Sequence, residues 1–262
     1  MQDKVHRLEE ILRSHAPLLV AYSGGVDSAC LLAVAQRTLG ANVVGVIADS
    51  PSLPREALAE ALEVAKGFGA QVEVVATQEF EDERYLSNPV NRCYFCKAEL
   101  FARMDALGRE RKFAAIAYGE NADDPAHLRP GSQAAKEFAV LAPLKQAGLT
   151  KADVRELSRQ LGLPTADAPA QPCLSSRIPH GTRVTRDALG LVERGEAFVR
   201  SLGFRVVRVR YLEGETAGAR VLVGAEELPL LERVRSAIVE GLRGAGFAFV
   251  EIDEQGYRGA TS

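Results

Sequence analysis

Through the first half of the chain, short apolar runs rich in β-branched residues alternate with longer segments whose apolar residues recur at helical spacing. A strand that is apolar at consecutive positions is typically buried on both faces, and helices between such strands are the crossovers of a parallel sheet. The pattern therefore predicts an α/β fold with helices on both faces of a parallel sheet. The expected strands are 17–22, 42–48, 71–76 and 113–119, with helices at 26–40, 53–70 and 96–111.

Two more elements are expected before the pattern changes. The apolar run 138–144, FAVLAPL, predicts a further short strand. Thr150 and Asp153 have the spacing of a capping box, so we expect a helix to begin there. Residues 164–172, PTADAPAQP, are rich in Pro and Ala and lack periodicity, which is typical of a linker or an ordered loop.

The rest of the chain has the pattern of a small α+β domain with its helices on one face. We therefore expect two domains, 1–170 and 171–262. The expected elements of the second are helices at 185–202 and 226–243 and strands at 204–212, 218–224 and 247–253.

Composition narrows the range of partners. The 262 residues are 47% hydrophobic, and 32 basic and 35 acidic residues give a formal net charge of -3, so nothing favours extended binding to nucleic acid or to a membrane surface. No apolar run approaches the roughly 18 residues that span a bilayer, and residues 1–17 predict a charged amphipathic helix rather than a signal peptide. We expect a cytoplasmic protein.

A glycine loop joins the first predicted strand to the first helix of the sheet. Its sequence, SGGVDS at 23–28, lacks the lysine of a Walker loop and the third glycine of a dinucleotide-binding loop. Backbone N–H groups and the helix dipole favour an anion at such a turn, although a plain strand-to-helix turn would use the same residue types.

The spacing S-G-G-x-D-S resembles the PP-loop of the adenine nucleotide α-hydrolase superfamily, which holds the β and γ phosphates of ATP as a pyrophosphate leaving group. This resemblance implies that the α-phosphorus stays open to attack, so that the substrate becomes adenylated. Asp27 would bind Mg²⁺, directly or through water. The expected ATP-binding residues are Ala21, Ser23, Gly24, Gly25, Asp27, Ser28, Ser50 and Gly119.

The four cysteines are unlike a disulfide framework, because a reducing compartment keeps thiols reduced. Cys93 and Cys96 form a C-x-x-C pair, which alone could be half a zinc site, a redox dithiol or part of an iron–sulfur site. Cys173 lies in a Pro-flanked loop with Arg177, a cation that can lower a thiol pKa, and three thiolates can hold a cubane cluster with one iron open. Unrelated buried thiols are the alternative, and Cys30 is expected in the core.

The motifs SGGVDS, NRCYFCK, YGENADD with RPG, and CLSSRIPHGT resemble in order and spacing the LarE family of ATP-dependent sacrificial sulfur transferases. The resemblance covers about residues 20–210, and CLSSRIPHGT is its most specific part, since the glycine loop also occurs in GMP synthetases, NAD synthetases and tRNA thiolation enzymes. Members of the family adenylate a carboxylate of pyridinium-3,5-biscarboxylic acid mononucleotide and replace it by a thiocarboxylate, toward the nickel-pincer nucleotide cofactor of lactate racemase.

The resemblance implies roles for the two domains and for several residues. The first domain would bind ATP, with the loop from Glu120 to Asp124 assisting Mg²⁺ and adenylation. The second would serve sulfur transfer, substrate binding and oligomerisation, with Cys173 supplying or managing sulfur. The family has a branch with one sacrificial cysteine and another with three cysteines on a 4Fe-4S cluster, and Cys93 and Cys96 place this chain in the second. A sulfide donor would then renew the sulfur.

Candidate substrate ligands follow from the same resemblance. Arg208 and Arg210 alternate on one strand face and, with Arg177, would bind the phosphate or second carboxylate of the substrate, together with Lys97. A solvated strand face is the alternative for the two strand arginines. Leu222 stands where the family often has an acidic residue, and His127 and His180 are interpreted as structural. The family precedent implies a homo-oligomer, with a hexamer as its form.

Two other functions are compatible with parts of this pattern. A PP-loop tRNA thiolase would also use cysteines, but its charge balance should include a basic face. A sensor that binds ATP or an iron–sulfur cluster without turnover would share both motifs and release no pyrophosphate.

Overall fold

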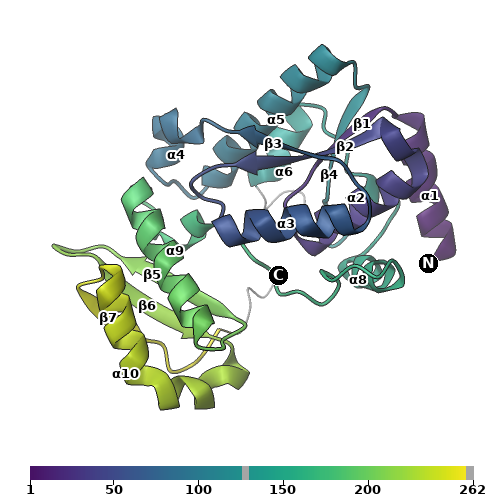
Figure 1. Ribbon diagram of the computed structural model, residues 1–262. Helices are drawn as coiled ribbons and strands as arrows, with labels where there is room; N and C mark the ends of the chain where they lie inside the picture. The colour runs from purple at the N-terminus through teal and green to yellow at the C-terminus, as the bar shows by residue number, and fades with distance from the viewer. Residues whose placement is uncertain (126–129, 258–262) are drawn as a thin grey trace. The chain divides into compact units, whose positions relative to one another are not determined.

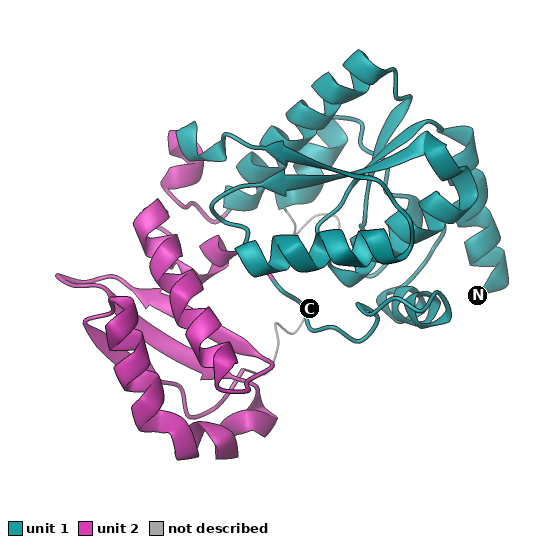
Figure 2. Cartoon of the chain, in the orientation of Figure 1, with its two compact units in different colours: residues 1–82, 91–171 teal, residues 83–90, 172–262 magenta. Residues whose placement is uncertain are grey.

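The computed structural model describes residues 1–125 and 130–257, and it divides into two compact units (Figure 2). Unit 1 comprises residues 1–82 and 91–171, and unit 2 comprises 83–90 and 172–262. Within the described ranges, no helix is both long enough and apolar enough to cross a membrane.

Unit 1 contains a four-stranded sheet in the order β3-β2-β1-β4, and every pair of neighbours is parallel. This confirms the predicted α/β fold with a parallel sheet. From β1 the chain builds the sheet in one direction with β2 and β3, and then adds β4 on the opposite side of β1. The strand order therefore reverses between β1 and β4. The strands are β1 (Leu18–Ala21), β2 (Val43–Asp49), β3 (Val72–Ala76) and β4 (Ala115–Tyr118).

Helices cover both faces of this sheet, as the apolar runs predict (Figure 1). Along β1, Leu18 and Val20 pack with the helices of one face, and Leu19 packs with those of the other. All three are fully buried, which is why the run has no polar positions. The first face carries α1 (Gln2–Ser14), α2 (Val26–Leu39), α3 (Arg55–Gly67) and α8 (Lys151–Gln160), and the second carries α5 (Arg92–Arg111) and α6 (Pro130–Glu137).

The expected strand at 138–144 is wrong in extent. Leu141 alone forms a parallel bridge, with Ala117 on β4. Ala139 takes a positive φ of 51°, and Pro143 lacks an N–H group and begins the short helix α7 (Pro143–Gln146), so pairing cannot extend in either direction. The remaining short elements are η1 (Gly40–Asn42), η2 (Glu79–Glu81), α4 (Glu83–Leu86), η3 (Leu174–Arg177) and η4 (Ala225–Glu227).

Unit 2 contains a three-stranded sheet in the order β5-β6-β7, antiparallel between β5 and β6 and parallel between β6 and β7. Alternate residues such as Val207 and Val209 enter one core with the two long helices, so Arg208 and Arg210 project from the opposite face. The elements are β5 (Val207–Leu212), β6 (Gly218–Val223), β7 (Phe249–Ile252), α9 (Arg186–Ser201) and α10 (Leu228–Ala245).

The segment 83–90 belongs to unit 2, although it precedes α5 of unit 1 in the chain. The Tyr85 hydroxyl lies 2.7 Å from the Oγ atom of Ser175, and both side chains are buried. The side-chain amide of Asn88 donates to the carbonyl of Pro179 at 2.7 Å. The units therefore differ from the expected ranges 1–170 and 171–262 mainly by this insertion, which braces the loop that follows Cys173.

The predicted capping box at the start of α8 is confirmed. Thr150 Oγ1 accepts from Asp153 N at 3.1 Å, and Asp153 Oδ2 accepts from Thr150 N at 3.0 Å. Lys4 of α1 donates to the same carboxylate at 2.6 Å. The hydrogen bond from Lys4, followed by those from Thr150, lowers the pKa of Asp153 to about 2.

The substitution Asp153→Asn should lower the free energy of unfolding by about 1 kcal/mol at pH 7, because the carboxylate is both cap and ion-pair partner. A depressed pKa stabilises the fold above the unfolded value of roughly 3.9, and this contribution is lost as the pH falls toward the folded value. Urea unfolding of both proteins between pH 7 and pH 3 measures the difference. A gap that stays constant over this range would contradict the role of the charge.

Candidate functional site

The glycine loop leaves β1 at Ala21 and enters α2, at the carboxyl edge of the sheet beside the point where the strand order reverses. This edge is where open α/β sheets bind ligands. Gly24 has a φ of +76°, and a Cβ atom there would lie 2.7 Å from the Cβ of Ala61, so the turn requires glycine. Gly25 is the N-cap of α2 and has no side chain with which to cap it.

Two serines give the loop its shape. Ser28 Oγ accepts from the backbone N–H of Ser23 at 3.1 Å and donates to the carbonyl of Gly25, also at 3.1 Å. The hydroxyls of Ser23 and Ser28 lie 3.0 Å apart. These bonds fold the loop over the start of α2, where helix geometry leaves the first N–H groups without intrahelical acceptors. The loop is therefore suited to an anion held by backbone N–H groups.

The loop after β4 packs directly against this helix start. A Cβ atom on Gly119 would lie 2.8 Å from the backbone nitrogen of Ser28, so glycine permits the close approach. The side-chain amide of Asn121 donates to Asp27 Oδ1 at 3.2 Å. The structure thus brings together the expected ATP-binding residues from β1, α2 and β4. Ser50, at the end of β2, is buried and lies 2.8 Å from the Ser52 hydroxyl, Oγ to Oγ.

Lys151 is a cation of this site that sequence reasoning missed. Its Nζ atom lies 2.6 Å from Asp27 Oδ2, and its backbone N–H donates to Asp123 Oδ2 at 2.8 Å. The capping box of Thr150 signals the start of α8, but only the tertiary fold shows that Lys151 reaches a carboxylate on α2. The glycine loop carries no lysine of its own, and α8 supplies one.

The acidic loop that follows β4 is built around buried Glu120. Its carboxylate accepts hydrogen bonds from Tyr118, from Ser132 at 2.9 Å and from Lys145 at 3.2 Å. Burial would raise the pKa of Glu120, but these three donors outweigh burial and hold the pKa below its ordinary value. Glu120 is therefore a charged anchor for the loop. Asp124 accepts from Asn121 N at 3.2 Å and so closes the turn that carries it.

Lys97, an expected substrate ligand, projects from α5 toward Tyr118 at the end of β4. Its ammonium lies 4.9 Å from the centroid of the Tyr118 ring, a cation–π contact. A Cβ atom on Gly131 would collide with the Lys97 side chain, so the lysine passes close to α6. His127, and Arg129 of the RPG motif, lie outside the described residues.

The cysteines occupy different environments. Cys93 is exposed and Cys96 is half-buried in the first turns of α5, three positions apart and so on one helix face. Cys173, also half-buried, precedes η3 in unit 2. Cys30 lies in the core, as expected, where burial raises the pKa of its thiol to about 11. Among the residues described, no group of three or more His, Cys, Asp or Glu side chains is arranged to hold a metal ion.

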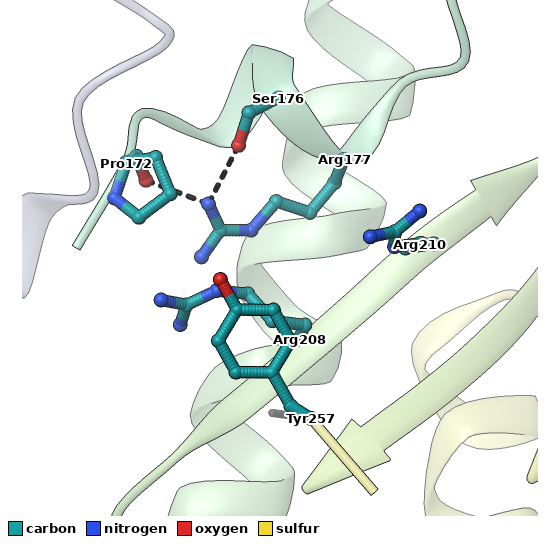
Figure 3. Close-up of a pocket in the computed structure, with 6 residues that line it drawn as sticks. All are labelled: Pro172, Ser176, Arg177, Arg208, Arg210 and Tyr257. Atoms are coloured by element: carbon teal, nitrogen blue, oxygen red, sulfur yellow. Dashed lines mark hydrogen bonds between the residues drawn. The ribbon is translucent and has the colours of Figure 1, made fainter. Parts of the chain in front are cut away.

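Unit 2 contains a small cavity of about 160 Å³ on the outer side of its sheet (Figure 3). Arg208 is buried and Arg210 is exposed, and both line the cavity from β5, as alternation on one face predicts. Burial lowers the pKa of Arg208, and the nearby charge of Arg177 lowers it further. An anion in the cavity would offset both effects. The lining residues are Pro172, Ser176, Arg177, Arg208, Arg210 and Tyr257.

Arg177 is only 4% exposed and its guanidinium is bound to the protein itself. Its Nε and Nη2 atoms donate to the two carboxylate oxygens of Glu196 at 2.7 and 3.1 Å. Its Nη1 atom donates to the carbonyl oxygens of Pro172 at 2.6 Å and Cys173 at 3.2 Å, and to Ser176 Oγ at 2.8 Å. The side chain expected to bind substrate thus holds the backbone on both sides of the cysteine.

Glu196 is fully buried on α9 and connects three parts of unit 2. Besides Arg177, it accepts from Arg200 at 2.9 Å and from the backbone N–H of Val209 at 3.1 Å. The Val209 bond occupies an N–H group of β5, which is an edge strand. Glu196 therefore ties the Cys173 loop to the strand that carries the two cavity arginines.

Comparison with known proteins gives two relatives over nearly the whole chain. No family model matches. The chain is 39% identical over 260 residues to the uncharacterized protein slr1717 of Synechocystis, covering 98% of this chain and 96% of that protein. It is 32% identical over 244 residues to the pyridinium-3,5-bisthiocarboxylic acid mononucleotide synthase of Lactiplantibacillus plantarum, covering 91% and 86% respectively. A more distant match, 24% identical over 196 residues, is one chain of the glutamine-hydrolyzing GMP synthase of Methanopyrus kandleri, covering 67% and 62%.

The substitution Glu196→Ala should lower the free energy of unfolding by about 3–5 kcal/mol, because it leaves the buried Arg177 charge without its carboxylate. The matched control is Glu156→Ala, which removes a half-exposed ion pair with Arg159 and should cost less than about 1 kcal/mol. Denaturant unfolding measures both. Equal costs for the two variants would show that the buried pair does not organise unit 2.

Proposed function

The chain belongs to the LarE family of sulfur transferases, and we propose that it converts a carboxylate of pyridinium-3,5-biscarboxylic acid mononucleotide to a thiocarboxylate at the expense of ATP. The proposal is supported by the 32% identity to the synthase of L. plantarum over 91% of the chain. The observation that carries the ATP-dependent step is the lysine-free glycine loop, which lies against the Gly119 turn at the carboxyl edge of the sheet. The same proposal retains a cytoplasmic homo-oligomer.

The first step would take place in unit 1. An oxygen of the substrate carboxylate attacks the α-phosphorus of ATP, the bond from that phosphorus to the bridging oxygen breaks, and pyrophosphate leaves with the electron pair. The N–H groups at the start of α2 would stabilise the departing charge, since Ser23 and Ser28 hold the loop over them. The product is an acyl adenylate, whose carbonyl carbon is a better electrophile than that of a carboxylate.

Asp27 has the position and exposure expected of a Mg²⁺ ligand. Its carboxylate lies at the start of α2, accepts from Lys151 and Asn121, and keeps 24% of its side chain exposed. Bound Mg²⁺ would neutralise phosphate charge. Asp27 would hold this ion, and the Lys151 ammonium, which pairs with Asp27 in this structure, would then be available to the phosphates. The carboxylates of Glu120 and Asp124, in the loop after β4, would add negative charge near the ion and so favour its binding.

The second step would use the Cys173 loop of unit 2. A sulfur nucleophile near Cys173, at the oxidation level of sulfide, would attack the carbonyl carbon of the adenylate. A C–S bond forms as the bond to the AMP oxygen breaks, AMP leaves with the electron pair, and the acyl group keeps the sulfur as a thiocarboxylate. Arg177 has its donors on Glu196 and on the carbonyls of the loop, so its role in this scheme is to hold Cys173 in place. Arg208 and Arg210 would bind the substrate phosphate in the cavity.

Three thiols have the chemistry and exposure of cluster ligands, although the described residues contain no group of three side chains already arranged around a metal position. Cys93 and Cys96 lie on one face of α5, and Cys173 is half-buried in its loop, whereas Cys30 is enclosed in the core. We propose that Cys93, Cys96 and Cys173 would hold a 4Fe-4S cluster, which when bound would supply the sulfur that a sulfide donor renews. The alternative within this family is that Cys173 gives up its own sulfur.

The experiment that tests adenylation measures AMP and pyrophosphate after addition of Mg·ATP and the biscarboxylate mononucleotide. We expect pyrophosphate release that depends on the acceptor, and an equal amount of AMP once sulfur transfer has discharged the acyl adenylate. A non-catalytic sensor would release none with any acceptor, and a tRNA thiolase would release pyrophosphate with tRNA alone. Either outcome contradicts the proposal.

A glycine variant links this activity to the loop. Gly119→Ala would place a Cβ atom 2.8 Å from Ser28 N and displace the start of α2, so the KM for ATP should rise roughly ten-fold or more. In Gly67→Ala the new Cβ meets nothing within 4 Å, and the KM should stay unchanged. An unaltered KM in Gly119→Ala would place ATP elsewhere.

The cluster is tested by the iron and sulfide content of protein purified without oxygen. The wild-type chain should contain about four iron atoms, and Cys93→Ala should lose most of them, because one of three thiolate ligands is gone. Cys30→Ala is the matched control and should retain its iron, since that thiol lies in the core. If reconstituted wild-type protein stays colourless, the cluster is excluded, and the mass of the intact protein after turnover shows whether Cys173 lost its sulfur.

A further inference from the structure

Tyr257 lines one side of the cavity in unit 2, and backbone pairing with the end of β6 holds it there. After β7 the chain leaves the sheet and returns, and Tyr257 N donates to the carbonyl of Val223 at 2.6 Å, in a parallel bridge with Gly224. Gly256 makes the return possible: its φ is +72°, and a Cβ atom there would lie 2.8 Å from the Cα of Ala225. Glycine is therefore needed to bring the tyrosine back to the sheet.

The tyrosine ring lies against one of the cavity arginines. The Arg208 guanidinium carbon is 5.1 Å from the centroid of the Tyr257 ring, a cation–π contact that fixes the orientation of a buried charge. Arg208 is on β5, on one side of β6. Tyr257 pairs with Gly224, directly after β6, on the side where β7 lies, so the contact between the two side chains crosses the middle strand. Figure 3 shows the tyrosine hydroxyl directed toward the guanidinium groups of Arg177 and Arg208.

Two polar groups of the cavity are committed to the Cys173 loop. Arg177 donates to Glu196 and to the Cys173 carbonyl. The Ser176 hydroxyl donates to the same carbonyl at 2.8 Å and accepts from Arg177. Among the described residues of the lining, Arg208, Arg210 and Tyr257 are the other side chains with donors that could face a bound anion.

Arg208 can serve an anion and the protein together. Its Nη1 atom donates to the Val207 carbonyl at 2.8 Å, and a guanidinium carries several N–H donors. The cavity volume of about 160 Å³ suits one small anionic group and is below the roughly 300 Å³ of sites that enclose whole ligands. The cavity is therefore sized and charged for the anionic end of a larger molecule.

Three donor side chains match the three terminal oxygens of a phosphate monoester better than the two oxygens of a carboxylate. We infer that Tyr257 is a specificity-determining residue: its ring holds Arg208, and its hydroxyl donates to a phosphate group, so that the cavity prefers phosphate monoesters to carboxylates. The inference rests on the proposed function only in taking the occupant to be the phosphate of a nucleotide-linked substrate. It assigns the carboxylates of such a substrate to other parts of the enzyme.

The test measures how phosphate protects Arg210, which is exposed at the cavity, from modification by phenylglyoxal. The full chain is titrated with inorganic phosphate or with acetate, and modification of the peptide that carries Arg210 is followed by mass spectrometry. This local readout excludes anions bound at the glycine loop. Wild-type protein should be protected by phosphate at a lower concentration than by acetate.

Tyr257→Phe should raise the half-protecting concentration of phosphate about ten-fold and leave that of acetate unchanged, because one hydrogen bond to a charged group is removed. Tyr257→Leu should also weaken protection by acetate, since Arg208 loses its cation–π contact with the ring. Tyr211→Phe, which removes the same hydroxyl from a neighbouring position of the same sheet, is the control and should behave as wild type.

The inference is overturned if Tyr257→Phe is protected like wild type, if phosphate does not protect the wild-type chain, or if acetate protects equally well. Because this assay needs neither ATP nor sulfur, its outcome is separate from that of the pyrophosphate assay. Pyrophosphate release without dependence on Tyr257 for phosphate binding would leave the proposed function standing and remove this inference. Phosphate binding that depends on Tyr257, without acceptor-dependent pyrophosphate release, would do the reverse.

Discussion

The pairing of β4 with β1 decides where the chemistry of unit 1 can take place. It brings the turn at Gly119 against the start of α2, and the approach is so close that no side chain fits between them. The glycine loop and the acidic loop, which are almost a hundred positions apart, thereby share one edge of the sheet. If β4 lay outside β3 instead, Asn121 could not reach Asp27, and the glycine loop would not have the acidic loop beside it.

A single carboxylate has the corresponding place in unit 2. Glu196 is fully buried and satisfied by Arg177, Arg200 and the edge of β5. A buried carboxylate is tolerated only when such donors surround it, so the pair is better understood as a geometric device than as a source of stability. It fixes the distance between the Cys173 loop and the cavity arginines.

The sequence predicts best what depends on local pattern. The strands of the sheet, the glycine loop and the capping box at Thr150 were all visible, because each has a signature a few residues long. The sequence does not predict the ion-pair partner of Asp27, because Lys151 lies far along the chain and only the packing of α8 on α2 brings the two side chains together. The run 138–144 looked like a strand since apolar residues fill it, yet the backbone at Ala139 and Pro143 permits a single bridge. Arg177 shows a further limit of sequence analysis. Its guanidinium is bound by the carboxylate of Glu196 on α9, and long-range polar pairs of this kind have no characteristic spacing in the sequence.

The two anion sites differ in a way that suits their proposed occupants. Within the glycine loop the donors are backbone N–H groups, whose partial charges favour an anion less strongly than full charges do. In unit 2 the donors are full charges on Arg208 and Arg210 beside an aromatic ring. In the proposed mechanism, pyrophosphate departs after each turnover, whereas the substrate phosphate stays bound through two chemical steps. A weaker site for pyrophosphate and a stronger one for the substrate would let both steps proceed.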